Sequence, residues 1–115
     1  MIEKIVLNHL SAHLSQDVYM ENPTPLPDSY VLVEKTGSSK RNQVNSATIA
    51  IQSYSTSMYG AASLNEEVKT CMDQLILNDT IARVELETDY NFTNTATKQY
   101  RYQAVYNITY YTEVQ

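Results

Sequence analysis

The chain has 115 residues and a mass of 13.1 kDa, with a formal net charge of −5 at pH 7 and a pI near 4.8. A chain of this length suits one domain, so we expect residues 1–115 to share a single core. The acidic balance disfavours nucleic-acid binding, because basic groups that neutralise phosphates normally drive it. Cys71 is the only cysteine, which excludes an internal disulfide. We find neither a cleavable apolar leader nor the ~18 apolar residues of a membrane span, and we expect a cytosolic protein without membrane contact.

The first predicted element is a helix that ends near Ser15. Its apolar face recurs every three or four residues and comprises Ile2, Ile5, Val6, His9, Leu10, His13 and Leu14. His9 and His13 lie one helical turn apart and could bind a metal. An HExxH site, however, needs a glutamate where Leu10 stands. We therefore interpret both histidines as packed or rim residues.

A short strand is predicted at residues 18–20, followed by a stiff connector at 22–28 that contains three prolines. Residues 30–35 form a continuous apolar run with a charged end, which indicates a buried strand. Residues 36–42 are polar and are predicted to form a projecting turn or loop. The densest basic stretch, with Lys35, Lys40 and Arg41, falls here. It is either a solvated loop or a contact surface.

Residues 44–54 alternate, with Ala47, Ile49 and Ile51 on one face of a predicted strand. A second helix then begins either at 55–57, where Ser and Thr can cap backbone donors, or at Ser63, where Ser63-x-x-Glu66 fits a capping box. Asn78-Asp79 ends it. The apolar stripe of this helix comprises Met58, Ala61, Ala62, Leu64, Val68, Met72, Leu75 and Ile76.

Two further strands are predicted at residues 81–90 and 100–111, joined by a polar turn at 91–97 and paired as an antiparallel hairpin. In the first, Ala82, Val84 and Leu86 should face inward, and Arg83, Glu85 and Glu87 outward. In the second, one face should hold Tyr100, Tyr102, Ala104, Tyr106, Ile108 and Tyr110. We therefore predict an α+β fold of order α-β-β-β-α-β-β. Two helices should cover one face of an antiparallel or mixed sheet.

The sequence contains no recognisable catalytic motif. Two glycines cannot build a phosphate loop, and no G-x-S-x-G elbow occurs. Glu85, Glu87 and Asp89 alternate and should be neighbours on one strand face, which could attract a cation, although a solvated strand face is the favoured interpretation. Cys71 fits a small buried hydrophobe better than a nucleophile. We expect a protein that is not an enzyme and has no catalytic residue, metal or cofactor.

The aromatic composition is unusual, with ten Tyr, one Phe and no Trp. Tyrosine combines rigid apolar area with a polar tip and suits a surface that is soluble alone and buried in an assembly. It also has a simple preference for strands. A base-stacking sheet, as in RNA-binding domains, would need positive surroundings, and this chain is acidic. The candidate contact residues on the last strand are Tyr100, Tyr102, Tyr106 and Tyr110, with Tyr111 beside them.

Several strings and their order resemble the small tail-component proteins of phages and prophages of Gram-positive bacteria, which are similar in fold to tail terminator proteins. These strings are Ala50-Ile51-Gln52-Ser53-Tyr54-Ser55, Ala61-Ala62-x-Leu64-Asn65-Glu66-Glu67-Val68, Asp89-Tyr90-Asn91-Phe92 and Tyr100-Arg101-Tyr102-Gln103-Ala104-Val105-Tyr106. The resemblance covers nearly the whole chain, and its strings are structural rather than catalytic.

The resemblance implies a hexameric ring that caps the tail tube, fixes tail length and offers a surface to the head connector. DNA would pass through the hole without specific binding. The protein would be assembled in the bacterial cytoplasm and reside at the head-proximal end of the virion tail. Lys35, Lys40, Arg41 and the tyrosines are the candidate subunit and tube contacts. Two alternatives remain: a head-completion or connector-stopper protein, and a monomeric α+β domain that binds a small ligand or nucleic acid.

Overall fold

The computed structural model describes residues 1–42, 44–97 and 99–111. Its elements, in chain order, are α1 (Ile2–His13), β1 (Asp17–Tyr19), β2 (Tyr30–Arg41), β3 (Val44–Ser55), α2 (Met58–Met72), the 3-10 helix η1 (Leu75–Leu77), β4 (Ile81–Asn91) and β5 (Tyr100–Tyr111). The strands form one sheet in the order β1-β2-β3-β5-β4. The predicted α+β class and element order are confirmed.

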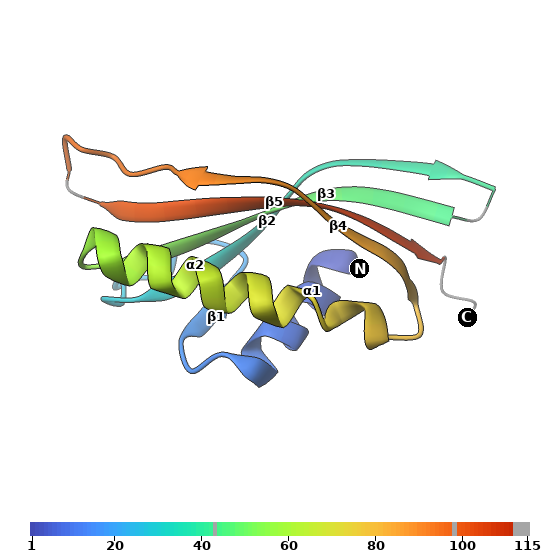
Figure 1. Ribbon diagram of the computed structural model, residues 1–115, viewed down its shortest axis with the longest axis horizontal. Helices are drawn as coiled ribbons and strands as arrows, with labels where there is room; N and C mark the ends of the chain where they lie inside the picture. The colour runs from blue at the N-terminus through green and yellow to red at the C-terminus, as the bar shows by residue number, and fades with distance from the viewer. Residues whose placement is uncertain (43, 98, 112–115) are drawn as a thin grey trace.

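The sheet is mixed because its shortest strand runs parallel to its neighbour. In β1, Asp17 pairs in parallel with Tyr30 of β2, whereas β2–β3, β3–β5 and β5–β4 are antiparallel. Figure 1 shows both helices on the same side of the sheet, with the opposite side free of helices. We call the helix-covered side the inner face and the other side the outer face.

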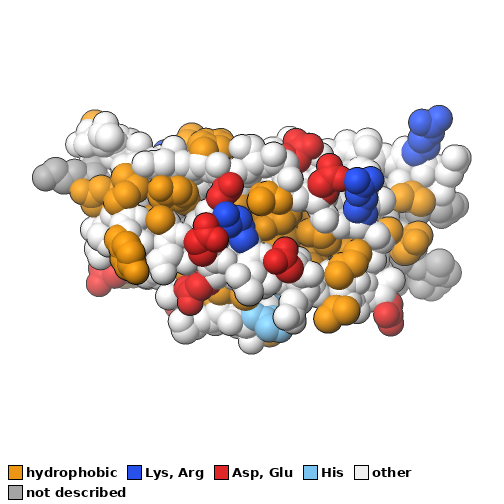
Figure 2. All heavy atoms as spheres, viewed as in Figure 1, with side chains coloured by type: hydrophobic (Ala, Val, Ile, Leu, Met, Phe, Trp, Pro, Cys, Tyr) orange, Lys and Arg blue, Asp and Glu red, His pale blue; other side chains and the backbone are white. Residues whose placement is uncertain are grey.

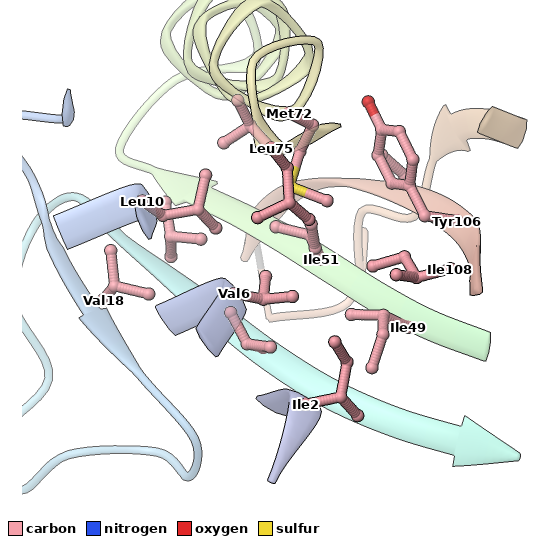
Figure 3. Packing of buried hydrophobic residues seen from close by; sticks show 14 of the residues in the cluster. Ile2, Val6, Leu10, Val18, Ile49, Ile51, Met72, Leu75, Tyr106 and Ile108 are labelled. Atoms are coloured by element: carbon pink, nitrogen blue, oxygen red, sulfur yellow. The ribbon is translucent and has the colours of Figure 1, made fainter. Parts of the chain in front are cut away.

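The core lies between the inner face and the helices. The buried residues Ile2, Val6 and Leu10 repeat along one side of α1, as the helical spacing predicts. Figure 3 shows these side chains converging with residues of β3, β5 and the α2–η1 segment. The strand and α2–η1 contributors labelled there include Ile49, Ile51, Met72, Leu75, Tyr106 and Ile108.

Helix α2 begins at the first of the two predicted positions. Ser57 is its N-cap, and the Ser57 hydroxyl accepts a hydrogen bond of 3.0 Å from the backbone N–H of Gly60. The alternative start at Ser63 is wrong, because that residue lies inside the helix. The helix ends at Met72, before the predicted boundary at Asn78, and η1 fills most of the interval.

Two register shifts alter the predicted faces of β4. They lie between Ile81 and Arg83 and between Leu86 and Thr88. The first places Ile81 in the core and leaves Ala82 exposed, so the predicted inward position of Ala82 is wrong. A bulge adds one residue to a strand and exchanges its two faces beyond that point, which simple alternation cannot anticipate.

Candidate assembly surface

Strand β2 continues far beyond the end of β1, which is its neighbour on the side away from β3. Strand β1 pairs with β2 through Tyr30–Leu32 alone, and β2 then runs to Arg41. Among the described residues, no strand lies beside β2 from Val33 onward on the side away from β3. This segment presents unpaired backbone donors and acceptors along one edge, which makes it a template for another strand.

The predicted loop at residues 36–42 is therefore wrong, because residues 36–41 belong to β2. Gly37–Arg41 pair with β3 in a ladder that ends with Arg41 opposite Val44, and Thr36 lies at a register shift just before it. Asn42 adopts a positive φ of 51° in the turn. Figure 1 shows this hairpin extending past the helices at one end of the molecule. We call Gly37–Arg41, the regular stretch after a register shift at Lys35/Gly37, the arm. The prediction that the segment projects is confirmed, and pairing with β3 supplies its strand structure.

The three predicted basic residues occupy different positions around this edge. Lys35 lies beside the body of the domain, where its Nζ is 3.8 Å from the Glu3 carboxylate of α1. Lys40 and Arg41 lie at the end of the arm and are exposed. By alternation, Arg41 is on the outer face, with Gly37, and Lys40 is on the inner face.

The opposite edge of the sheet is β4, and its acidic residues do not share one face. Glu85 and Glu87 are exposed on the outer face, where Glu85 pairs with Arg83 and Glu87 accepts a hydrogen bond from Asn107. The second register shift turns Asp89 toward the inner face. The predicted trio of neighbouring carboxylates is thus separated. Among the described residues, no cluster of three His, Cys, Asp or Glu side chains could hold a metal ion.

Asp89 instead ties β4 to α2. Its Oδ2 accepts hydrogen bonds from Lys69 Nζ at 2.9 Å and from Asn65 Nδ2 at 3.0 Å. The bond from Lys69 holds the pKa of the Asp89 carboxyl below its ordinary value, and the bond from Asn65 acts in the same direction. Glu66 adds a second, exposed carboxylate 3.0 Å from Lys69. The cluster fixes the acidic edge against the helix layer.

The predicted tyrosines do share the inner face of β5, but the helices cover that face. Tyr106 is 2% exposed and belongs to the hydrophobic core. Burial raises its hydroxyl pKa to about 12. Tyr100, Tyr102 and Tyr110 are half-buried along the same face. Tyr106 therefore contributes to the fold, and only the other three offer surface to a partner.

Sequence reasoning missed a second aromatic cluster on the outer face. The rings of Tyr30 and Tyr54 stack in parallel with centroids 4.5 Å apart, and Tyr19 meets Tyr30 edge to face. The guanidinium of Arg101 lies 5.8 Å from the Tyr54 centroid and 4.3 Å from that of Phe92. Alternation of Tyr30 with the buried Val31 was the available signal, because it places the tyrosine on the opposite face.

The rest of the outer face is polar and laterally hydrogen-bonded. In one row, Gln52 Nε2 donates to Gln103 Oε1 at 2.8 Å, and Gln103 Nε2 donates to the Tyr90 hydroxyl at 2.5 Å. In another, the Thr48 hydroxyl donates to Asn107 Oδ1 at 3.0 Å. A hollow of about 430 Å³ lies on this face, lined by small residues of β2 and β3 and by Arg83, Glu85, Asn107 and Thr109. The satisfied side chains give this face little apolar area for a partner.

Of the histidine and cysteine candidates, His9 links the two helices through the backbone of Cys71, and His13 bonds within α1. His9 Nε2 lies 2.6 Å from the carbonyl oxygen of Cys71, and His13 Nδ1 lies 2.8 Å from the carbonyl oxygen of His9. Burial raises the pKa of the Cys71 thiol, and the negative charge of Glu67 adds to the shift. A reactive cysteine needs the opposite shift, so these contacts favour the predicted packing roles.

Figure 2 shows how charge is distributed on the side of the molecule where β4 and α2 lie. Acidic side chains gather over these two elements, and a basic side chain projects near the end of the β2–β3 hairpin. In the described part of the chain, neither helix has the length and apolar character needed to cross a membrane. No known family model matches the chain, and no curated protein matches it.

Proposed function

We propose that this protein is a phage or prophage tail terminator, a structural protein that caps the tail tube as a homo-oligomeric ring and joins it to the head connector. The observation that carries the proposal is the arm, the projecting end of β2, whose edge away from β3 has no strand partner among the described residues. Such an edge suits addition of a strand from another protein molecule. The resemblance of the helix and β5 strings to phage tail components supplies the biological setting.

The charge of the chain is compatible with this function. Six copies at −5 each would carry a formal charge of about −30. A ring whose inner wall shared part of that charge would repel DNA phosphates, so DNA could pass without binding. The tail-tube protein and the head-completion or connector protein are the proposed partners, and the head-proximal end of the virion tail is the proposed location.

Addition of the protein to polymerising tail-tube subunits tests the proposal. We expect tubes to stop growing and electron microscopy to show a ring on one end. Tubes that lengthen normally with bare ends contradict it. Binding to the purified portal complex in place of the tube would instead identify a connector-stopper protein, which is the alternative within the same assembly pathway.

A further inference from the structure

We infer that copies of this chain join edge to edge, with the basic arm of one copy beside the acidic β4 edge of the next. The inference rests on the proposed ring and names the surfaces that close it. The two edges lie on opposite sides of the same sheet, since the strand order begins with β1-β2 and ends with β4. Joining them continues one sheet into the next.

The two regular edge stretches are similar in length, with five residues in the arm and four in β4. The arm, Gly37–Arg41, follows one register shift, and Arg83–Leu86 of β4 lies between two. Bulges discourage indiscriminate strand pairing, and here they divide β4 into two short regular stretches, Arg83–Leu86 and Thr88–Asn91. In the second, Asp89 is already held by Lys69, so we place the contact on the first. A few backbone hydrogen bonds would form along it. The side chain of Leu86, which is 42% exposed, would lose apolar surface on contact.

Charge complementarity selects the second copy as the occupant and sets its orientation. The arm ends in Lys40 and Arg41, whereas β4 presents Glu85 and Glu87 at its outer face; Arg83 beside them pairs with Glu85 and leaves a net negative charge there. Arg41 lies on that same face of its own sheet. Two arms or two β4 edges brought together would place like charges side by side. The favoured contact is therefore head-to-tail, the arrangement that generates a ring when its rotation closes and an open filament when it does not.

A charge-swap experiment tests this contact by sedimentation velocity and native mass spectrometry. We expect K40E/R41E and E85K/E87K each to weaken self-association about ten-fold or more. Mixing the two variants should restore it, because every arm then meets a β4 edge of opposite charge. The control variant E21K/E67K carries the same net charge as E85K/E87K but keeps both contact surfaces, so it should self-associate like the wild type. Circular dichroism confirms that every variant is folded.

Crosslinking determines the direction of the contact. In a Cys71→Ser background, Ser39→Cys marks the outer face of the arm and Thr88→Cys marks that of β4. The double variant should give a ladder of oligomers with a short thiol crosslinker, and each single variant should stay monomeric. Dimers from Ser39→Cys alone would show arm-to-arm pairing and overturn the inference.

The remaining outcomes separate this inference from the proposed function. Charge variants that associate like the wild type overturn the edge contact, and normal tube capping by those variants would leave the terminator function standing. A charge swap that restores association in a protein that never caps tubes supports the contact and removes the function. A wild-type chain that stays monomeric at its highest soluble concentration, together with a double cysteine variant that gives no ladder, overturns the inference.

Discussion

Replacement of Asp89 by alanine tests whether the β4–α2 cluster stabilises the acidic edge. The substitution removes the acceptor of both Lys69 and Asn65. Asn65 is 1% exposed, and its Oδ1 has no hydrogen-bond partner among the described residues. Without Asp89, its Nδ2 would also lose the hydrogen bond that the cluster provides. Lys69 would retain Glu66. The main cost is therefore the stranded Asn65 amide.

The magnitude follows from these contacts. A buried polar group left without a partner costs about 1–3 kcal/mol. The partly exposed Lys69–Asp89 ion pair adds up to about 1 kcal/mol. We expect Asp89→Ala to lower the free energy of unfolding by about 2–3 kcal/mol. For a domain of this size, that corresponds to a fall in Tm of about 10 °C.

Urea denaturation followed by circular dichroism measures the loss, with two matched variants. Asp89→Asn keeps an acceptor for Asn65 and should cost about 1 kcal/mol. Glu66→Gln removes only the exposed partner of Lys69 and should cost less than about 0.5 kcal/mol.

The charge contribution also has a defined pH dependence. Because the folded-state pKa of Asp89 is lowered, its stabilisation is present above the unfolded pKa of about 3.9 and is lost as pH falls through the folded value. The difference between wild type and Asp89→Asn should therefore shrink below about pH 4. An Asp89→Ala cost no larger than that of Glu66→Gln would refute the reasoning.

Three further predictions concern the helices and the core. Gly60→Ala should destabilise the protein despite the better helix propensity of alanine, because the new Cβ would lie 2.3 Å from the Ser55 hydroxyl; a raised Tm would contradict this. In a spectrophotometric titration, Tyr106 should ionise near pH 12. Since burial raises its pKa, its contribution to stability is full below about pH 10 and falls as pH rises through 12; loss of the late step in Tyr106→Phe checks the assignment. Cys71 should react with a thiol reagent at pH 8 more slowly than free cysteine, because its pKa is raised. Glu67→Gln removes one cause of that shift and should make the reaction faster. A wild-type rate equal to that of free cysteine would contradict the prediction.

Local periodicity was sufficient for most of the fold. The helical recurrence of Ile2, Val6 and Leu10 and the alternation of Ala47, Ile49 and Ile51 both placed the correct residues in the core. Ser57 at the start of α2 was predictable, because a helix cap depends on residues that are close together in the sequence. Helix faces and strand faces repeat over a few positions, so the sequence by itself determined the α+β class and the element order.

The tertiary structure decided the features that concern the candidate surface. The polar segment at residues 36–41 is a strand because β3 pairs with it, and its own residues favour a turn. The bulges of β4 turn Asp89 away from Glu85 and Glu87, and the helices cover Tyr106 on a face that the sequence left unassigned. Register and layer order depend on contacts between residues far apart in the chain, whereas periodicity reports only on neighbours.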